Sequence, residues 1–202
     1  MGAIGYMIRN SPTMGDGLRG LLLHLHLHDK GAAPLLLGHD SSCVILGYSI
    51  YRHGTPATEN IYDAAIAIGY KLMRELCGSS WHPIHVQFAY GEPNHTAPYR
   101  RFFGSSVSFD ADVSGILFDS SWLEKPIEDA DATLHGILAK TIREEEAKFP
   151  MSFGEQVRVV LHQMVLSGTA TTDSIARLFG IHERTLRRRL EQEGKSLQQL
   201  IK

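Results

Sequence analysis

Residues 173–200 read DSIARLFGIHERTLRRRLEQEGKSLQQL, and this stretch decides the fold of the C-terminal part of the chain. Its apolar spacing predicts a short helix over residues 173–179 and a second, basic helix over residues 183–193. Gly180-Ile181-His182 separates them as a short turn, and Gly194 ends the second helix. A short helix, a glycine-containing turn of about three residues and a basic helix form the helix-turn-helix design.

The second of these helices has two chemically different faces. Leu186 and Leu190 are one turn apart and form an apolar pair, whereas the arginines fall on another face. In a helix-turn-helix the free face of this helix enters the major groove, where arginine binds guanine bidentately or holds a phosphate. The candidate DNA-contacting residues are Arg184, Thr185, Arg187 and Arg188. The alternative is an ordinary three-helix bundle that exposes a run of arginines.

A further helix is expected before this pair, over residues 155–166. Its predicted apolar face holds Val157, Val160, Leu161, Met164 and Val165. Ser167-Gly168 ends this helix, and the cap residues at 171–173 start the next one. The pattern therefore predicts that residues 155–202 are all-helical.

Charge divides the chain at the Phe149-Pro150 pair, where proline disfavours a continuing helix. Residues 1–150 hold 12 basic and 17 acidic residues, whereas residues 151–202 hold 8 basic and 5 acidic residues. The net charges are therefore −5 and +3, within a total of −2 over 202 residues. A basic tail on an acidic body indicates an anionic partner such as nucleic acid, or simply a solvated helix face.

The first part of the chain alternates helices with a few short strands. Helices are expected over residues 11–29, 58–77, 96–103 and 131–148, and strands over 33–38, 42–51, 84–89, 106–109 and 115–119. Residues 39–42 predict a hairpin-type turn between the first two strands. The apolar stripe of the 58–77 helix consists of Ile61, Ala64, Ala65, Ile68, Leu72, Met73 and Leu76. Ser11-Pro12 is the expected start of the first helix, although Leu23 to His28 alternates as a strand would. This order predicts an α+β domain, a small mostly antiparallel sheet with helices on one face, followed by the all-α unit.

Composition and motifs exclude several classes of protein. No stretch approaches the length and hydropathy of a membrane span, and the start of the chain does not resemble a secretory signal. Cys43 and Cys77 have no metal-binding spacing and are too few for a disulfide framework. Nucleophile-elbow, phosphate-loop and zinc-protease motifs are missing from the sequence. We expect a cytoplasmic protein that is not an enzyme, with no cofactor and no membrane partner.

His24, His26 and His28 form an alternating run that raises the alternative of a metal-dependent protein. On a strand all three would share one face, whereas on a helix only His24 and His28 would. Histidines on a solvated face are the commoner explanation, so we expect no metal site.

Residues 173–200 resemble the first helix-turn-helix of the AraC-family transcription regulators. The resemblance is carried by Ile175-Ala176, Leu178-Phe179-Gly180, Thr185-Leu186-Arg187-Arg188, Gly194 and Ser196-Leu197. It implies base-facing side chains at Arg184 and Arg188, with Arg187 beside them. His182 stands where that family more often has Ser or Asp as the helix cap.

The body of the chain resembles the arabinose-binding effector-sensing domain of the same family, as found in regulators similar to ornithine and arginine catabolism activators. This resemblance is carried by residues 46–48, 86–88, 97–104 and 115–126. It implies that residues 1–150 form an effector-sensing and dimerising domain. Residues 151–202 would then be the first helix-turn-helix of a DNA-binding region that normally has two, so we expect a chain truncated after the first unit.

The resemblance implies double-stranded DNA, a small amino-acid-like or sugar effector, and a second copy of the chain as partners. The alternative is a ligand-binding, dimerising fragment that does not bind DNA alone. The ligand-binding residues remain unassigned. Polar or aromatic candidates at strand ends and in loops are Tyr48, Arg52, His53, Tyr99 and Arg100, each of which could equally cap the sheet or pair with an acidic residue.

Overall fold

The computed structural model describes residues 2–28, 32–40, 42–50, 56–148, 152–166, 171–178 and 181–201. The chain divides into two compact units, Met1–Glu145 and Glu146–Lys202. The expected junction at Phe149-Pro150 lies outside the described residues. Within the described ranges no helix is both long and apolar enough to cross a membrane.

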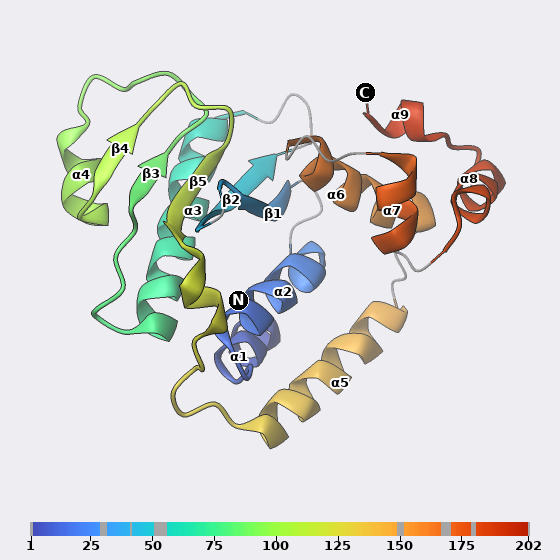
Figure 1. Ribbon diagram of the computed structural model, residues 1–202, viewed down its shortest axis with the longest axis horizontal. Coiled ribbons are helices and arrows are strands. Elements are labelled where there is room, and N and C mark those ends of the chain that lie inside the picture. Colours follow the sequence, from blue (N-terminus) through green and yellow to red (C-terminus); the bar gives the residue numbers. More distant parts are fainter. Residues whose placement is uncertain are drawn as a thin grey trace. The chain divides into compact units, whose positions relative to one another are not determined.

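The first unit combines helices with a five-stranded sheet (Figure 1). Its elements, up to the helix that contains the division, are α1 (Gly2–Arg9), α2 (Met14–His24), the 3-10 helix η1 (Leu25–Leu27), β1 (Ala32–Gly38), β2 (Cys43–Ile50), α3 (Thr58–Cys77), β3 (His85–Gln87), α4 (Ala97–Phe103), β4 (Ser106–Ser108), β5 (Ser114–Asp119), the 3-10 helix η2 (Ser120–Glu124) and α5 (Ala132–Lys148). The expected α+β class is confirmed.

The strands are ordered β1-β2-β5-β3-β4. Three of the four pairings are antiparallel, as expected, whereas β3 and β4 run parallel. Strand β5, the last in sequence, lies between β2 and β3, so strands distant along the chain are neighbours in the sheet. Helices α2 and α3 pack against the face that carries Leu46, Val86 and Ile116. This face therefore supplies the main core of the unit.

Two glycines, Gly47 of β2 and Gly115 of β5, lie opposite each other in the centre of the sheet. A Cβ atom at Gly115 would lie 2.5 Å from Ile45 Cγ2 and 3.1 Å from the Leu46 carbonyl oxygen. Neither neighbour moves easily, because Ile45 is buried and branched at its Cβ atom and the Leu46 carbonyl belongs to the backbone of β2. Any side chain at position 115 would overpack the sheet.

We expect Gly115→Ala to lower the free energy of unfolding by about 1–3 kcal/mol. Urea unfolding followed by tryptophan fluorescence measures this, since Trp81 and Trp122 both lie in the first unit. The matched control is Gly136→Ala in α5, where a Cβ atom meets nothing within 4 Å. That control should raise helix stability by about 0.5–1 kcal/mol. Equal effects of the two substitutions would contradict the close approach at Gly115.

The start of the predicted 11–29 helix is wrong, and α1 was not predicted. Ser11 is buried, and its hydroxyl donates to the Met7 carbonyl at 3.0 Å, so it closes α1 instead of starting α2. The N-cap of α2 is Thr13, whose hydroxyl oxygen accepts the Asp16 N–H at 3.1 Å. The alternating run after His24 is also no strand, because residues 25–27 form η1.

Helix α3 has the predicted bounds but only part of the predicted buried face. Leu72 and Met73 are buried as expected, and so is Ile66, which was not expected. Ile68 was expected inside, yet 54% of its surface is exposed. The face of α3 around Ile68 therefore does not pack closely against the rest of the unit.

The second unit is helical, with α6 (Phe153–Leu166), α7 (Thr172–Leu178), α8 (Glu183–Gln192) and α9 (Leu197–Ile201). Its core consists of Val157, Leu161, Ile175, Ala176, Leu186, Leu190 and Leu200. The expected inward positions 157 and 161 on α6 are thus confirmed, whereas the side chains at 160, 164 and 165 lie outside the described part.

Candidate functional site

Helix α8 is amphipathic and is anchored by its leucine pair. Leu186 and Leu190 are almost fully buried, at 0% and 1% exposure, and they pack with Ile175 and Ala176 of α7. The Ile181 N–H donates to the Ala176 carbonyl at 3.0 Å, which links the end of α7 to the residues that precede α8. Burying one side of α8 in this way leaves the opposite side facing solvent.

His182 occupies the N-cap position of α8 and caps it with its backbone alone. Its dihedral angles are extended, and its carbonyl accepts the N–H groups of Thr185 and Leu186 at 2.9 and 3.0 Å. The imidazole makes no capping hydrogen bond. A residue other than Ser or Asp is therefore compatible with the start of this helix.

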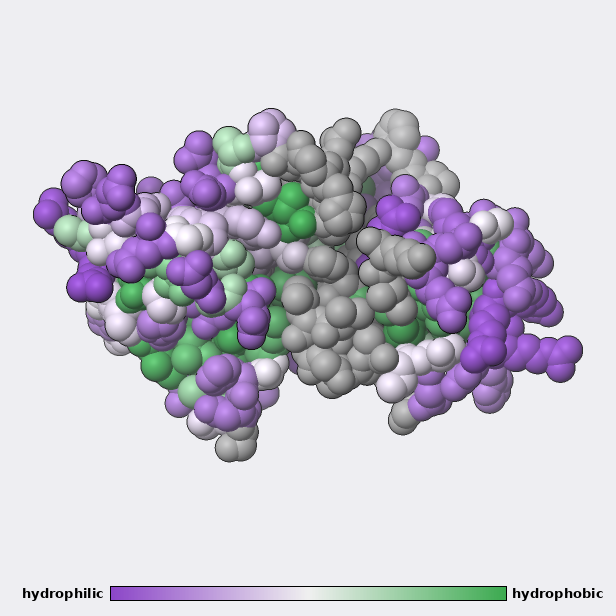
Figure 2. All heavy atoms as spheres, turned by 90° about the horizontal axis from the view of Figure 1, so that it is seen from above, coloured by the Kyte–Doolittle hydropathy of each residue, from purple (hydrophilic) through white to green (hydrophobic). Residues whose placement is uncertain are grey.

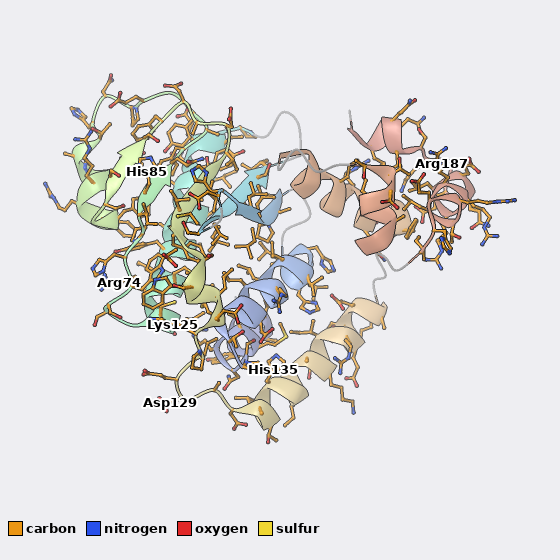
Figure 3. All side chains as sticks on the ribbon, viewed as in Figure 1. Arg74, His85, Lys125, Asp129, His135 and Arg187 are labelled. Atoms are coloured by element: carbon orange, nitrogen blue, oxygen red, sulfur yellow. The ribbon has the colours of Figure 1, made fainter. Side chains whose placement is uncertain are left out.

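The predicted DNA-contacting arginines lie on the outer face of α8. Arg184, Arg187 and Arg188 are exposed and Thr185 is half-buried. Figure 2 shows hydrophilic side chains gathered over this helix, and Figure 3 labels Arg187 among its side chains. Arg187 pairs with Glu183 at 3.6 Å, but both partners are well exposed, so the pair contributes little. The face therefore presents guanidinium groups that an anion can reach.

Arg189 has a different role from its neighbours. Its guanidinium carbon lies 5.3 Å from the ring centroid of Phe153, at the start of α6. This cation–π contact joins α8 to α6 within the second unit. The sequence pattern left Arg189 out of the candidate site, and the geometry gives it a packing contact.

Glu193, which the sequence pattern did not single out, fixes the start of α6. Its carboxylate accepts the Phe153 and Gly154 N–H groups at 2.7 and 2.9 Å, and Lys195 Nζ lies 3.2 Å away. These hydrogen bonds, above all the one from Gly154, lower the pKa of the Glu193 carboxyl below its ordinary value of 4.5. The carboxylate therefore satisfies two of the N–H groups that a helix N-terminus leaves free.

A pH dependence of the second unit follows from this lowered pKa. A carboxyl whose pKa is lower when folded contributes stability above its unfolded pKa, and this contribution is lost as the pH falls through the folded pKa. We expect the Gly154 amide resonance to titrate with a midpoint below 4.5, measured by NMR. We also expect thermal unfolding, followed by circular dichroism, to lose stability over the same range. Glu193→Gln should reduce both effects, and an unchanged pH profile in that variant would refute the assignment.

The first unit contains an apolar cavity of about 230 Å³. It lies between helices α2, η1 and α3 on one side and strands β1, β2 and β5 on the other. Leu46, Ile66 and Leu72 line it, together with Ala65 and Gly69 on α3. Tyr48 supplies the only polar side chain among the described residues of its wall.

The candidate effector-binding residues are not brought together. Tyr48 lines the apolar cavity, whereas Tyr99 lies in α4 and takes part in a separate network. Arg100 is exposed, and Arg52 and His53 lie outside the described residues. A polar site made of these five residues therefore has no support among those that are described.

The separate network is centred on Asp63 of α3. Its carboxylate accepts hydrogen bonds from the hydroxyls of Tyr90 and Tyr99, the latter at 2.9 Å. Burial raises the pKa of the Tyr90 hydroxyl, and the hydrogen bond to Asp63 raises it further. The Tyr90 and Tyr99 rings also contact Phe88, so the network ties α3 to the aromatic cluster beside α4. Sequence analysis missed it because the three residues are far apart in the chain.

The histidines do not form a metal centre in the described part of the chain. No group of three or more His, Cys, Asp or Glu residues there is placed to hold a metal ion. His26 Nδ1 lies 2.8 Å from the Leu23 carbonyl within a helical turn. His85 (Figure 3) instead links β3 to β4, with its ring nitrogens 2.7 Å from the hydroxyls of Ser106 and Ser108. The strand arrangement that would align His24, His26 and His28 is not formed.

Cys43 and Cys77 are both free and half-buried. Burial raises the pKa of Cys77 to about 11, so this sulfur remains a protonated thiol near neutral pH. Such a thiol is a weak nucleophile.

Residues 1–127 match the family described as the arabinose-binding domain of AraC transcription regulator, N-terminal. The chain belongs to this family. The resemblance inferred from the sequence to the AraC regulators is thereby confirmed. The proteins that carry this domain are transcription regulators.

Curated relatives agree with this membership. The HTH-type transcriptional regulator VirS of Mycobacterium tuberculosis is 25% identical over all 202 residues, in two strains. The chain spans 59% of the length of this relative. The crystal structure of the transcriptional regulator CdpR from Pseudomonas aeruginosa has a similar fold, with a TM-score of 0.58 and 17% identity. That likeness covers 99% of this chain and 65% of CdpR.

Proposed function

We propose that this AraC-type regulator is an effector-responsive protein that binds DNA sequence-specifically. In this proposal residues 1–150 sense the effector and dimerise in the cytoplasm, and residues 151–202 act as a helix-turn-helix that contacts DNA. The observation that carries the proposal is the outer face of α8, where Arg184, Arg187 and Arg188 are exposed while Leu186 and Leu190 are buried.

The proposed roles follow from position along α8. Arg184 lies in its first turn and Arg188 one turn later, which suits two contacts to base edges in one major groove. Thr185 and Arg187 lie beside them and suit phosphate contacts, which set the register on the duplex. The weak ion pair between Arg187 and Glu183 does not prevent a phosphate contact by Arg187, because an exposed ion pair exchanges readily for a phosphate.

The regulatory step in this proposal is a shift between two populations. An effector that binds one arrangement of the sensing part more tightly favours that arrangement by its difference in affinity. In a homodimer such a shift changes the spacing of two recognition helices relative to the half-sites on DNA.

The second candidate is a dimerising, effector-binding regulator that does not bind DNA alone. The small number of exposed cations on α8 favours it, because few phosphate contacts release few counterions. Binding by one such unit is then weak at physiological salt, so the monomer is expected to bind DNA poorly unless it dimerises.

Selection from a pool of randomised duplexes at low salt tests sequence-specific binding. The proposal predicts enrichment of a short motif of about three to five base pairs, the reach of one recognition helix. Bound duplexes without any enriched motif would favour nonspecific binding. No retained duplex at low salt, from a chain that sediments as a dimer, would favour the second candidate.

A further inference from the structure

Two wall positions of the apolar cavity of the first unit have little or no side chain and leave it space. They are Ala65 and Gly69, both on α3. A Cβ atom added at Gly69 would lie 3.7 Å from Ile116 Cδ1 and 3.8 Å from Leu46 Cδ2, which is ordinary van der Waals contact. A larger side chain at this position would therefore extend into the cavity without meeting the backbone first.

The wall determines which molecules can occupy the cavity. Apart from Tyr48, the described wall residues are Leu, Ile, Pro, Ala and Gly. A charged amino acid would lose its hydration there without gaining an ionic partner, and a sugar would leave most of its hydroxyls unpaired. The described wall of this cavity therefore suits an apolar molecule better than the amino-acid-like or sugar effector that the family resemblance implied.

The dimensions and access of the cavity also suit a small apolar molecule. A cavity of about 150 Å³ lined by aliphatic side chains accommodates benzene, so about 230 Å³ accommodates a molecule of roughly ten heavy atoms. Ile68 lines the cavity and is 54% exposed, so the cavity reaches the surface at this residue. A ligand can therefore enter without the sheet opening.

Occupation of this cavity would act on the main core of the first unit. Leu46, Leu72 and Ile116 line the cavity and also belong to the largest buried cluster. The same residues join α3 to β2 and β5, whose pairing runs through the centre of the sheet. A ligand in contact with them stabilises one packing of α3 on the sheet.

We propose that this cavity binds the effector, and that the effector is an uncharged, mainly apolar molecule of about ten heavy atoms, such as a bicyclic aromatic compound. The assignment of an effector rests on the proposed function above. The presence of a ligand site does not rest on it, so the two are tested separately.

The ligand test uses the whole chain with 2-naphthol as probe and with L-arabinose, L-ornithine and L-arginine as comparison compounds. Thermal unfolding and ligand-observed NMR should show saturable binding of 2-naphthol and none of the three polar compounds at equal concentration. No saturable binding of 2-naphthol, or tighter binding of a polar compound, would overturn the proposal.

Substitution at Gly69 locates the site. Gly69→Leu should weaken 2-naphthol binding by at least about tenfold, because the added side chain occupies the ligand's space. Gly69→Ala, whose Cβ atom fits at 3.7 Å, should weaken binding less and keeps the test valid if the leucine variant does not fold. Gly136→Ala, in open space on α5, is the matched control and should bind as the wild type does. Equal affinities in all four proteins would overturn the cavity as the site.

A DNA titration with and without 2-naphthol separates the two proposals. A change in DNA affinity that is lost in Gly69→Leu supports the effector role. Cavity-dependent binding that leaves DNA affinity unchanged would overturn that role while keeping the ligand site. Failure of the chain to bind DNA at all would contradict the proposed function and leave the ligand measurements unaffected.

Discussion

Replacing Arg184 and Arg188 together by alanine is expected to weaken binding to a selected duplex by at least about 30-fold. Each well-placed arginine contact to a base is worth about 1–3 kcal/mol, and these two side chains are exposed one turn apart on the outer face of α8. Fluorescence anisotropy of a labelled duplex at one fixed salt concentration measures the loss. The double variant should keep its fold, since neither side chain contributes to the core of the second unit.

Arg189→Ala is the matched control for charge. It removes the same positive charge from the same helix, but this guanidinium lies against Phe153. We expect its effect on DNA affinity to be within about threefold, with a larger effect on the thermal stability of the second unit. If Arg189→Ala weakened binding as much as the double variant, net charge and not the face of α8 would govern DNA binding.

Phe88→Ala is expected to lower the free energy of unfolding by about 3–5 kcal/mol. Phe88 is fully buried, and its ring lies 5.2–6.1 Å from the rings of Tyr90, Tyr99, Phe103 and Phe109. The substitution removes the centre of this cluster and leaves a cavity that aromatic neighbours fill poorly. Urea unfolding followed by the fluorescence of Trp81 and Trp122 measures the change.

Phe102→Ala provides the comparison for Phe88. Phe102 belongs to the same aromatic group but is 43% exposed, so its removal leaves less cavity and loses less buried area. We expect Phe102→Ala to lower the free energy of unfolding by well under half as much as Phe88→Ala does. Equal losses would show that the aromatic cluster is not organised around Phe88.

Periodicity predicted the elements that carry strong local signals. Helix α3 was predicted with its observed bounds, because a long amphipathic stripe precedes Gly78, which adopts φ +79° after the last turn. The β1–β2 hairpin was also predicted, and Asp40 accounts for its turn by accepting the N–H groups of Ser42 and Cys43 at 2.7 Å each. Both signals lie within a few residues of the element they specify.

Elements that depend on distant partners were predicted poorly. The true cap of α2 is Thr13, which forms an antiparallel bridge with Pro126, more than a hundred residues away. The insertion of β5 between β2 and β3 likewise depends on pairings across the whole first unit. No local pattern reports such contacts, because they depend on the arrangement of the completed sheet.

The candidate DNA-contacting face was predictable to the extent that helical spacing separates Leu186 and Leu190 from the arginines. The packing contact of Arg189 could not be predicted, because it depends on where α6 places Phe153. The cavity was visible in the sequence only as small residues on α3. Whether Ala65 and Gly69 face the sheet or solvent is decided by the packing of that helix.

The salt dependence of DNA binding by the intact chain tests the central claim most directly. Anisotropy or sedimentation titrations with a selected duplex from about 50 to 200 mM salt give the slope of log affinity against log salt. The three arginines of the proposed DNA-contacting face, Arg184, Arg187 and Arg188, predict a slope between about −2 and −4 for one unit, and a slope nearer zero after removal of Arg184 and Arg188. A salt-independent affinity, or the same slope in the double variant, would contradict the assignment of α8 as the DNA-contacting helix.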